Sequence, residues 1–338
     1  MTVEDPFGVA ADPVLTTLAR SVDPAAVQAL LDAGVEGLAA PGAAELTAIR
    51  VIRHKPQRRC LVEYDVTIAE PDGARTRLTA IGKVRRNRPG RHQLRLQQAF
   101  RAAGFDGRAG DGIAVPQPLG EIPELSMWLQ RRVEGVPATD LLLEPGAEPL
   151  AVRLVDAAHK IHSAGVPTHK THDIADEMRI LRDCLLAVTV ADPGHAEEVE
   201  AILTGCSRLA GRLPVTPPTG IHRDYYSDQV LVDGERLNVV DFDLYTRGDA
   251  ALDVGNLLGH VTEHALRHTG DADALAGVEA AALEHVGRLA GPGERTATQT
   301  YAVLSLARHV FLASERPGRD HLVAAVIDAT RTRLARAV

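Results

Sequence analysis

Apolar residues recur at two different spacings in the first part of the chain. Over residues 12–34 they recur at every third or fourth position, which predicts two short helices. Beyond residue 45, apolar and polar residues alternate, as they do in strands that bury one face. Three such strands are expected, at residues 46–54, 60–69 and 77–85. Pro56 in the first connection, and proline and glycine in the second, are typical of turns, so we expect hairpins and an antiparallel sheet.

The remainder of the chain is mainly helical by the same criterion. A helix at residues 91–103 and two extended segments, 119–122 and 125–133, would complete a small N-terminal sheet. Six longer segments then show helical spacing: residues 150–162, 174–189, 196–212, 251–268, 274–289 and 297–313. One hairpin, residues 221–243, interrupts them. We therefore predict an α+β, bilobal fold with a small antiparallel-sheet N-lobe, residues 1–133, and a larger, mainly helical C-lobe, residues 134–338.

Composition and charge exclude several classes of protein. The chain has 338 residues, of which 45% are hydrophobic and 24% charged, as in ordinary globular proteins. The net charge of −8 is unlike that of a general nucleic-acid binder. No apolar run approaches the ~18 residues of a membrane span, and Glu4 and Asp5 stand where a secretory signal is basic. With three dispersed cysteines, we expect a cytoplasmic protein with no nucleic-acid or membrane partner.

The hairpin at residues 221–243 carries the candidate chemistry. It begins with His222, Arg223 and Asp224, and an amide, Gln229, follows five residues after Asp224. After a turn and an apolar strand, the chain reaches Asp241-Phe242-Asp243. Phosphoryl transfer needs such a set, because one carboxylate orients the attacking hydroxyl while an amide and a second carboxylate hold Mg²⁺ on the phosphates.

These residues resemble the aminoglycoside phosphotransferase family of kinase-like enzymes. The resemblance rests on His222-x-Asp224 with its amide, on residues 240–243 and on residues 248–258, and it extends over the chain from about residue 45. It implies a protein-kinase-like fold, with ATP or GTP as phosphoryl donor and Mg²⁺ as cofactor. The implied acceptor is a hydroxyl of a small molecule, such as an antibiotic, an aminoglycoside-like compound or a sugar.

The resemblance also implies roles for individual residues. Asp224 would be the catalytic base, His222 would be a second catalytic residue, and Asp253 would be a buried carboxylate that braces the catalytic loop. The metal would be held by Gln229, Asp241 and Asp243. The implied nucleotide site comprises Lys83 on the third strand, Arg58 and Arg59 in the first turn, and Met127, Leu129 and Gln130 at a hinge that grips the base.

Three features depart from the family pattern. The family usually has asparagine where this chain has Gln229, and the longer side chain shifts the amide oxygen by about one bond length. The helix that would supply a glutamate partner for Lys83 has no acid between residues 85 and 105. The turn at residues 55–59, expected to cover the nucleotide, lacks glycine, so cationic side chains would replace backbone amides there. These departures leave a nucleotide-binding pseudoenzyme or scaffold as an alternative.

A protein kinase is the less favoured alternative. His222-Arg223-Asp224 also spells the catalytic loop of protein kinases. However, the sequence has no glycine-rich phosphate loop of the usual spacing, no glycine after Asp241-Phe242, and no Ala-Pro-Glu segment. A small-molecule hydroxyl is therefore the better acceptor.

Two patterns in the helical part each allow two interpretations. Between residues 241 and 285 there are nine acids against two arginines, which would suit a cationic acceptor, but a solvated acidic helix face explains the count equally well. His260, His264 and His268 share one helix face, either as metal ligands or, as we prefer, as a solvated or interface stripe.

Overall fold

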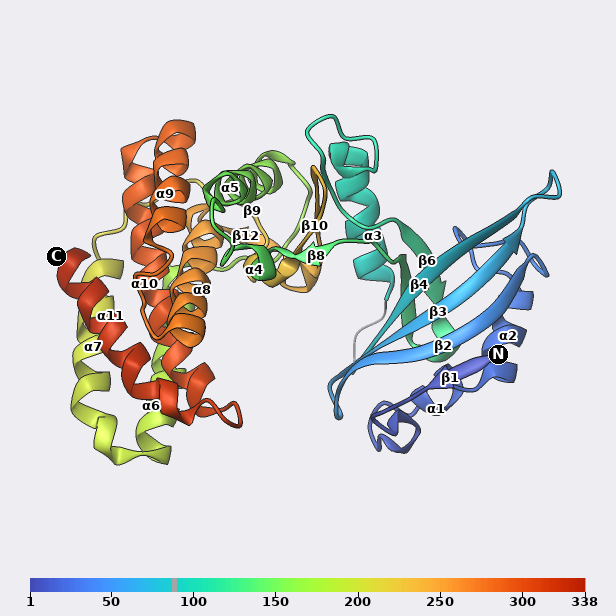
Figure 1. Ribbon diagram of the computed structural model, residues 1–338, viewed down its shortest axis with the longest axis horizontal. Helices are drawn as coiled ribbons and strands as arrows, with labels where there is room; N and C mark the ends of the chain where they lie inside the picture. Colours follow the sequence, from blue (N-terminus) through green and yellow to red (C-terminus); the bar gives the residue numbers. More distant parts are fainter. Residues whose placement is uncertain (87–89, 338) are drawn as a thin grey trace. The chain divides into compact units, whose positions relative to one another are not determined.

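The computed structural model describes residues 1–86 and 90–337 (Figure 1). The chain divides into two compact units, Met1–Glu134 and Gly135–Val338. The first unit is built on a sheet and the second is mainly helical. The division lies one residue after the boundary expected from the sequence. Within the described ranges, every helix is too short or too polar to cross a bilayer.

The sheet of the first unit has six strands in the order β1-β2-β3-β4-β7-β6. Its strands are β1 (Thr2–Glu4), β2 (Ala44–Lys55), β3 (Arg59–Ala69), β4 (Arg75–Arg85), β6 (Pro118–Ile122) and β7 (Met127–Arg131). The neighbours from β2 onward are antiparallel, as predicted. Strand β1 was not predicted, because three residues are too few to show alternation, and it pairs parallel with β2.

Helices pack on the sheet of the first unit. The lead-in helices α1 (Leu18–Ser21) and α2 (Pro24–Asp32) share a core with strands β2, β3 and β4. Asp23 caps α2 by accepting the N–H of Ala25 at 3.0 Å, just before the proline that begins the helix. Helix α3 (Arg91–Phe100) contacts β6 and β7, and a two-residue strand, β5 (Ile113–Ala114), follows it.

The second unit has eight helices and two small antiparallel ladders within the described residues. The helices are α4 (Ala138–Leu141), α5 (Glu148–Ser163), α6 (Ile174–Ala191), α7 (Ala196–Ala210), α8 (Ala251–Thr269), α9 (Ala276–Ala290), α10 (Pro292–Ser314) and α11 (Val323–Ala337). Strand β10 (Val230–Asp233) pairs with β8 (Val136–Pro137) and β11 (Arg236–Val239), and β9 (Thr219–Ile221) pairs with β12 (Thr246–Gly248).

Helix α11 was missed in the sequence, because its apolar stripe is interrupted. Thr330 is fully buried on that stripe, where an apolar residue would be expected. Its hydroxyl donates to the carbonyl of Val326 at 2.7 Å, so the polar group is satisfied inside the helix. Polar residues of this kind weaken the periodic signal without preventing burial.

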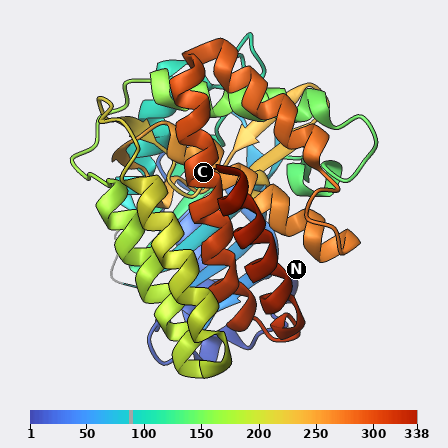
Figure 2. The same cartoon turned by 90° about the vertical axis from the view of Figure 1, so that its left-hand side faces the viewer.

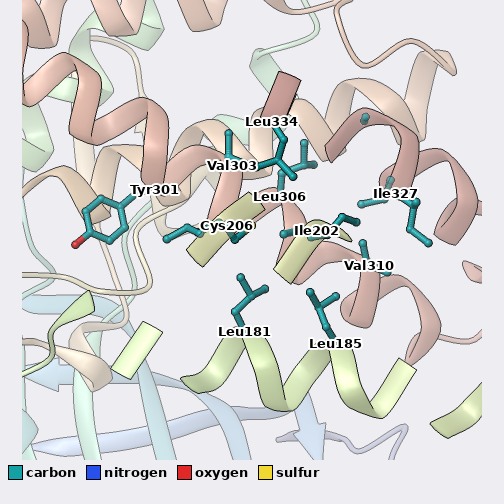
Figure 3. Packing of buried hydrophobic residues seen from close by; sticks show 14 of the residues in the cluster. Leu181, Leu185, Ile202, Cys206, Tyr301, Val303, Leu306, Val310, Ile327 and Leu334 are labelled. Carbon is teal, nitrogen blue, oxygen red and sulfur yellow. The ribbon is translucent and has the colours of Figure 1, made fainter. Parts of the chain in front are cut away.

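Helices α6, α7, α10 and α11 lie side by side (Figure 2) and share the main core of the second unit. Leu185 on α6, Ile202 on α7 and Val310 on α10 are each fully buried, and Ile327 on α11 is 3% exposed (Figure 3). Burying a side chain of this size contributes about 1.5–3 kcal/mol. This core therefore supports α10, the helix against which α8 packs.

Two glycines bring α8 close to α10. A Cβ atom at Gly255 would lie 2.3 Å from the Cβ of Tyr301, and one at Gly259 would lie 2.5 Å from the Cβ of Ser305. Residues four apart share a helix face, so these glycines form one contact surface. Any side chain here would push the helices apart. The backbone of α8, which carries Asp253 and Asn256, is thereby held directly against α10.

Candidate active site

The loop that carries Asp224 lies beside the N-terminus of α8. Strand β9 leads into the loop, and β12 leads into α8 through Asp249. The two strands pair antiparallel, with Ile221 opposite Thr246. Asp249 Oδ1 accepts the N–H of Ala251 at 3.1 Å, at the start of α8. The first residues of α8 therefore meet the residues that follow Ile221.

Asp253 on α8 binds the backbone of this loop directly. Its Oδ2 accepts the N–H of His222 at 2.8 Å, and its Oδ1 accepts the N–H of Arg223 at 2.7 Å. Nε2 of His162 also lies 2.9 Å from Oδ2. Asp253 is fully buried, so these bonds form away from water, where they are strongest. The brace expected from the family resemblance is thus present in the structure.

Asn256, one turn further along α8, holds the other side of the loop. Its Nδ2 donates to the carbonyl of Tyr225 at 3.0 Å. Its Oδ1 accepts from Ser305 Oγ and from Arg308 Nη2, each at 2.9 Å. Sequence reasoning assigned Asn256 no role, because its two partners on α10 are about fifty residues away and no local pattern connects them. The backbone on both sides of Asp224 is therefore fixed from α8.

His222 connects the two halves of the hairpin. Its Nε2 lies 2.9 Å from the carbonyl of Val240, and since a carbonyl only accepts, Nε2 carries the proton. The ring is fully buried, with its centroid 4.8 Å from that of Phe242. His222 thus holds the segment around Asp241 against the loop that carries Asp224.

Gln229, Asp241 and Asp243 are brought together by backbone pairing. Val230 pairs with Val239, and the N–H of Val240 donates to the carbonyl of Gln229 at 2.9 Å. Asp241 follows directly, and Asp243 lies in the short turn Phe242–Leu244, where it is buried. The hairpin therefore places the amide and both carboxylates at one end of β10 and β11.

Backbone strain is concentrated at the same place. Arg223 has φ of 70° and Asp241 has φ of 63°, in the left-handed region that disfavours residues other than glycine. Each such residue costs about 1–3 kcal/mol and persists only where its surroundings hold it. Here the surroundings are the Asp253 brace and the bond from His222 to the carbonyl of Val240. Strained residues of this kind cluster at functional sites.

Asp224 itself is left available. Its neighbours Arg223 and Tyr225 have their backbone bound by Asp253 and Asn256. The Asp224 carboxylate is partly exposed, and within residues 1–86 and 90–337 no group donates a hydrogen bond to it. The loop therefore presents one carboxylate whose lone pairs are free for another molecule.

A network of charged side chains supports the Asn256 contact with the loop that carries Asp224. His172 forms a hydrogen bond with Glu177 on α6, and Arg308 Nη1 lies 3.9 Å from Glu177 Oε2. Burial raises the pKa of Glu177, but this hydrogen bond and the charges of Arg308 and Arg223 outweigh it, so the net shift is downward. Glu177 therefore stays ionised and steadies the arginine that holds Asn256.

The first unit holds the residues expected to bind the nucleotide. Lys83 on β4 is 8% exposed and lies opposite Trp128 on β7, so the sheet brings it beside Met127 and Leu129. Strand β7 is paired on both sides, by β4 and by β6. A backbone contact from Met127, Leu129 or Gln130 to a base would have to replace a sheet hydrogen bond. Residues 133 and 134, just beyond β7, lie outside any strand.

Helix α3 supplies an amide where the family pattern suggests an acid. Gln97 is 4% exposed, and its Nε2 donates to Oε1 of Gln130 at 2.7 Å. The helix is thereby linked to the end of β7. Gln93, one turn earlier, is also buried. The absence of glutamate leaves a neutral, amide-lined face on α3.

The turn between β2 and β3 is held by the lead-in segment. Arg58 is exposed in this turn, and Arg59 begins β3 opposite Arg85. Gln57 has φ of 60°, and its N–H donates to Asp12 Oδ2 at 2.8 Å. Sequence reasoning missed Asp12, because a buried carboxylate in a loop carries no periodic signal. It fixes the conformation of a turn that has no glycine.

The histidine stripe on α8 does not form a metal centre. Across the described residues, no group of three His, Cys, Asp or Glu side chains is placed to hold a metal ion. His260 stacks on Tyr226, with ring centroids 4.2 Å apart, and His264 Nδ1 lies 3.1 Å from Nη2 of Arg267. His264 is only 5% exposed, so the expectation of a solvated stripe is wrong for this residue. His260 packs against the loop that carries Asp224.

Comparisons with known proteins identify a matching family and similar folds. The model of the phosphotransferase enzyme family matches residues 73–294. No curated protein sequence matches the chain. A choline/ethanolamine kinase family protein from Mesorhizobium loti is similar in structure, with a TM-score of 0.55 at 17% identity over 96% of this chain and 94% of that one.

Two further solved structures show the same fold. A glucosamine kinase has a TM-score of 0.51 at 20% identity, over 81% of this chain and 90% of that one. A thermostable mutant of an aminoglycoside phosphotransferase, solved with AMP-PNP and hygromycin B, has a TM-score of 0.54 at 17% identity, over 87% and 94%. The predicted α+β, bilobal, kinase-like fold is confirmed. Because the family model spans most of the sequence, including the hairpin that carries Asp224 and Asp241, the chain belongs to the phosphotransferase enzyme family.

Proposed function

We propose that this protein transfers the γ-phosphoryl group of ATP or GTP, with Mg²⁺, to a hydroxyl of a small molecule. The observation that carries the proposal is the fixed backbone around an available carboxylate. Asp253 and Asn256 hold the residues on either side of Asp224, whose own carboxylate stays free of hydrogen bonds from the described residues. This is the arrangement needed to orient an attacking hydroxyl.

In this proposal Asp224 accepts a hydrogen bond from the acceptor hydroxyl and takes its proton as the hydroxyl oxygen bonds to the γ-phosphorus, while the bond from that phosphorus to the bridging β-phosphate oxygen breaks and the nucleoside diphosphate leaves. Gln229 and Asp241, with Asp243, offer amide and carboxylate oxygens, the ligand type that Mg²⁺ prefers. When bound, Mg²⁺ would neutralise charge on the donor phosphates. The bond from Val240 N–H to the carbonyl of Gln229 keeps the backbone of Gln229 next to the residue that precedes Asp241. Catalysis would then depend on position and charge.

The first unit would bind the nucleotide. Lys83 would contact the α- and β-phosphates, with Arg58 and Arg59 in the turn above them. Since β7 is paired on both sides, we propose that Met127, Leu129 and Gln130 shape the base pocket, and that backbone groups of residues 133 and 134 bind the base.

The acceptor in this proposal is a sugar, an aminocyclitol or a related antibiotic. Support comes from similar structures, which include a glucosamine kinase and an aminoglycoside phosphotransferase with hygromycin B. If the acceptor is an antibiotic, its phosphorylation would give resistance. We place the reaction in the cytoplasm, where nucleotide is available and where Cys60, Cys184 and Cys206, which are unpaired, stay reduced.

A nucleotide-binding scaffold is the second candidate. It is favoured by helix α3, which has Gln93 and Gln97 but no acid to pair with Lys83. In that case the protein would bind Mg²⁺-nucleotide but transfer phosphate to no acceptor. The two candidate functions therefore predict the same nucleotide binding and differ in whether phosphate is transferred to an acceptor.

Thermal unfolding with ATP or GTP, with and without Mg²⁺, tests the nucleotide site first. A ligand that binds only the folded state raises the midpoint, by an amount that corresponds to about 2.7 kcal/mol at a hundredfold excess over Kd. Asp224→Ala should keep this rise and lose transfer, whereas Asp241→Ala should lose the Mg²⁺-dependent rise as well. Asp233→Ala, an exposed aspartate of the same hairpin, is the matched control. Full transfer by either active-site variant would contradict the assignment.

A further inference from the structure

A cluster of arginines and histidines lies next to the catalytic loop, on α8, on α10 and in the segment after α10. We call it the Arg–His patch. Its members are His260, Arg267, Arg308, His309, Arg316 and Arg319. The side chains of Arg267, Arg308 and Arg319 are 26%, 22% and 28% exposed, so these guanidinium groups are neither buried in the core nor free in solvent.

Ring stacking joins the patch to the catalytic loop. Tyr226, two residues after Asp224, stacks on His260 with ring centroids 4.2 Å apart and an angle of 15° between the planes. The ring of His260 meets that of His309 edge-on at 4.4 Å. Arg267 lies two turns further along α8, about 10 Å from His260 at 1.5 Å per residue. The patch therefore continues along α8 for about 10 Å beyond the histidine that stacks on the loop.

The charges that act most strongly on His260 and His309 are positive. Burial, followed by the charges of Arg308, Arg316 and neighbouring arginines, lowers the pKa of His309 to about 3. The pKa of His260 is likewise far below its ordinary value, with burial again the first cause. Both imidazoles are thus neutral at pH 7. His309 is 4% exposed, and its Nε2 has no hydrogen-bond partner among the residues that the structure describes.

Carboxylates near the patch do not match its arginines one to one. Glu263 accepts from Arg267 Nε at 3.0 Å and from Arg319 Nη1 at 3.3 Å, so one carboxylate serves two arginines. Asp228 on the loop also acts on Arg319. Arg308 Nη1 lies 3.9 Å from Glu177 Oε2, and within the described part of the chain no carboxylate forms an ion pair with Arg316, which is exposed. Arg316 is therefore the member of the patch whose charge no carboxylate of the described residues balances.

Some of the acids counted in the sequence are used elsewhere in the second unit. Asp273 pairs with Arg333 and Arg336 of α11, and Glu279 pairs with Arg333. Asp253 is occupied by the catalytic loop. Two of the nine acids between residues 241 and 285, Asp273 and Glu279, are thus neutralised by arginines that follow later in the chain.

We propose that the acceptor carries an anionic group, a carboxylate or a phosphate, which binds the Arg–His patch while its hydroxyl reaches Asp224. The inference rests on the proposed phosphotransferase function and specifies its substrate class. Guanidinium groups bind carboxylates and phosphates through paired N–H donors, and a neutral imidazole adds one more. A neutral or amine-bearing acceptor would form no charge-assisted hydrogen bond with these guanidinium groups.

Glucose and three derivatives of glucose that differ in charge test this proposal directly. Glucose, glucosamine, glucuronate and glucose 6-phosphate are compared as ligands, by the rise in unfolding midpoint with Mg²⁺ and a non-hydrolysable ATP analogue, and as acceptors with ATP. We expect both anions to bind, and the one that binds more tightly identifies carboxylate or phosphate as the group recognised. Arg316→Gln should weaken the binding of that anion about tenfold, the size of one charge-assisted hydrogen bond. Arg316→Lys should restore part of it, and the KM for ATP should not change.

The matched control is Arg331→Gln, an exposed arginine on α11 outside the patch. It should bind the anions as the wild type does. Preference for glucosamine or glucose, binding of neither anion, or equal anion binding by Arg316→Gln and wild type would overturn the inference. Anion binding that depends on Arg316, without transfer to any acceptor, would support the patch while contradicting the proposed enzymatic function. The two failures are therefore distinguishable.

Discussion

Replacing Asp253 by asparagine tests whether the catalytic loop is braced from α8. The change keeps the size of the side chain, so it creates no cavity. One of the two carboxylate oxygens becomes an amide NH₂ group, which faces the N–H of either His222 or Arg223. A buried donor that loses its acceptor costs about 1–3 kcal/mol. We expect the free energy of unfolding of the second unit to fall by that amount.

Urea unfolding followed by circular dichroism measures this loss, because the helical signal comes mainly from the second unit. Trp128, the single tryptophan, reports the first unit separately by fluorescence. Asp271→Asn is the control, since Asp271 is exposed and caps the N–H of Asp273 with one oxygen that asparagine retains. Its effect should stay below about 0.5 kcal/mol.

The same variant should lose activity by about a hundredfold, as expected if Asp224 moves by about 1 Å. Nucleotide binding by the first unit should not change. If Asp253→Asn unfolds within about 0.5 kcal/mol of the wild type and keeps full transfer, the brace is not what holds the loop, and the reasoning from these hydrogen bonds is refuted.

Three further predictions concern the second unit. Leu185→Ala should cost about 2–5 kcal/mol, whereas Leu186→Ala, next in sequence but 48% exposed, should cost under about 0.5 kcal/mol in urea unfolding; equal losses would contradict the core assignment. The pKa of His309 is about 3 in the folded protein, whereas that of an unfolded histidine is about 6.5. As the pH falls below about 6.5, the unfolded form therefore takes up a proton that the folded form does not, and the free energy of unfolding decreases. His309→Gln should therefore lose about 2 kcal/mol less than wild type between pH 7 and pH 5, and an unchanged pH dependence would argue against a neutral, buried imidazole. Iodoacetamide should modify Cys184 before Cys206, whose burial raises its pKa to about 12, as read by intact mass; modification of both at one rate would contradict the burial.

Helices and strands in which burial recurs at a regular spacing could be predicted from the sequence. Strand β3 alternates over its whole length, and the turns beside it contain proline and glycine, so the antiparallel pairing followed. The hairpin that carries the proposed site could be found in the sequence because the proposed chemistry requires Asp224, an amide and Asp241 at fixed spacing. Strand β1 could not, since three residues carry no period.

Contacts between segments that are distant in the sequence could not be predicted from the sequence pattern. The role of Asn256 depends on its hydrogen bond with Arg308, which lies on another helix. The excess of acids after residue 240 suggested a negative site, but Arg333 and Arg336 on α11 neutralise Asp273. A count within a window omits charges that the fold brings in from outside it. A count of charged residues therefore indicates the charge of a site only once it is known which helices pack together.

The glycine contact between α8 and α10 also determines when the site can form during folding. Gly255 meets Tyr301 across a long stretch of chain, and closing such a loop costs entropy that delays the contact. Asp253 and Asn256 can hold the loop only after α8 has docked in this way. The left-handed conformations of Arg223 and Asp241 are then among the last features to form. A newly made chain should therefore acquire its helical content first and its activity afterwards.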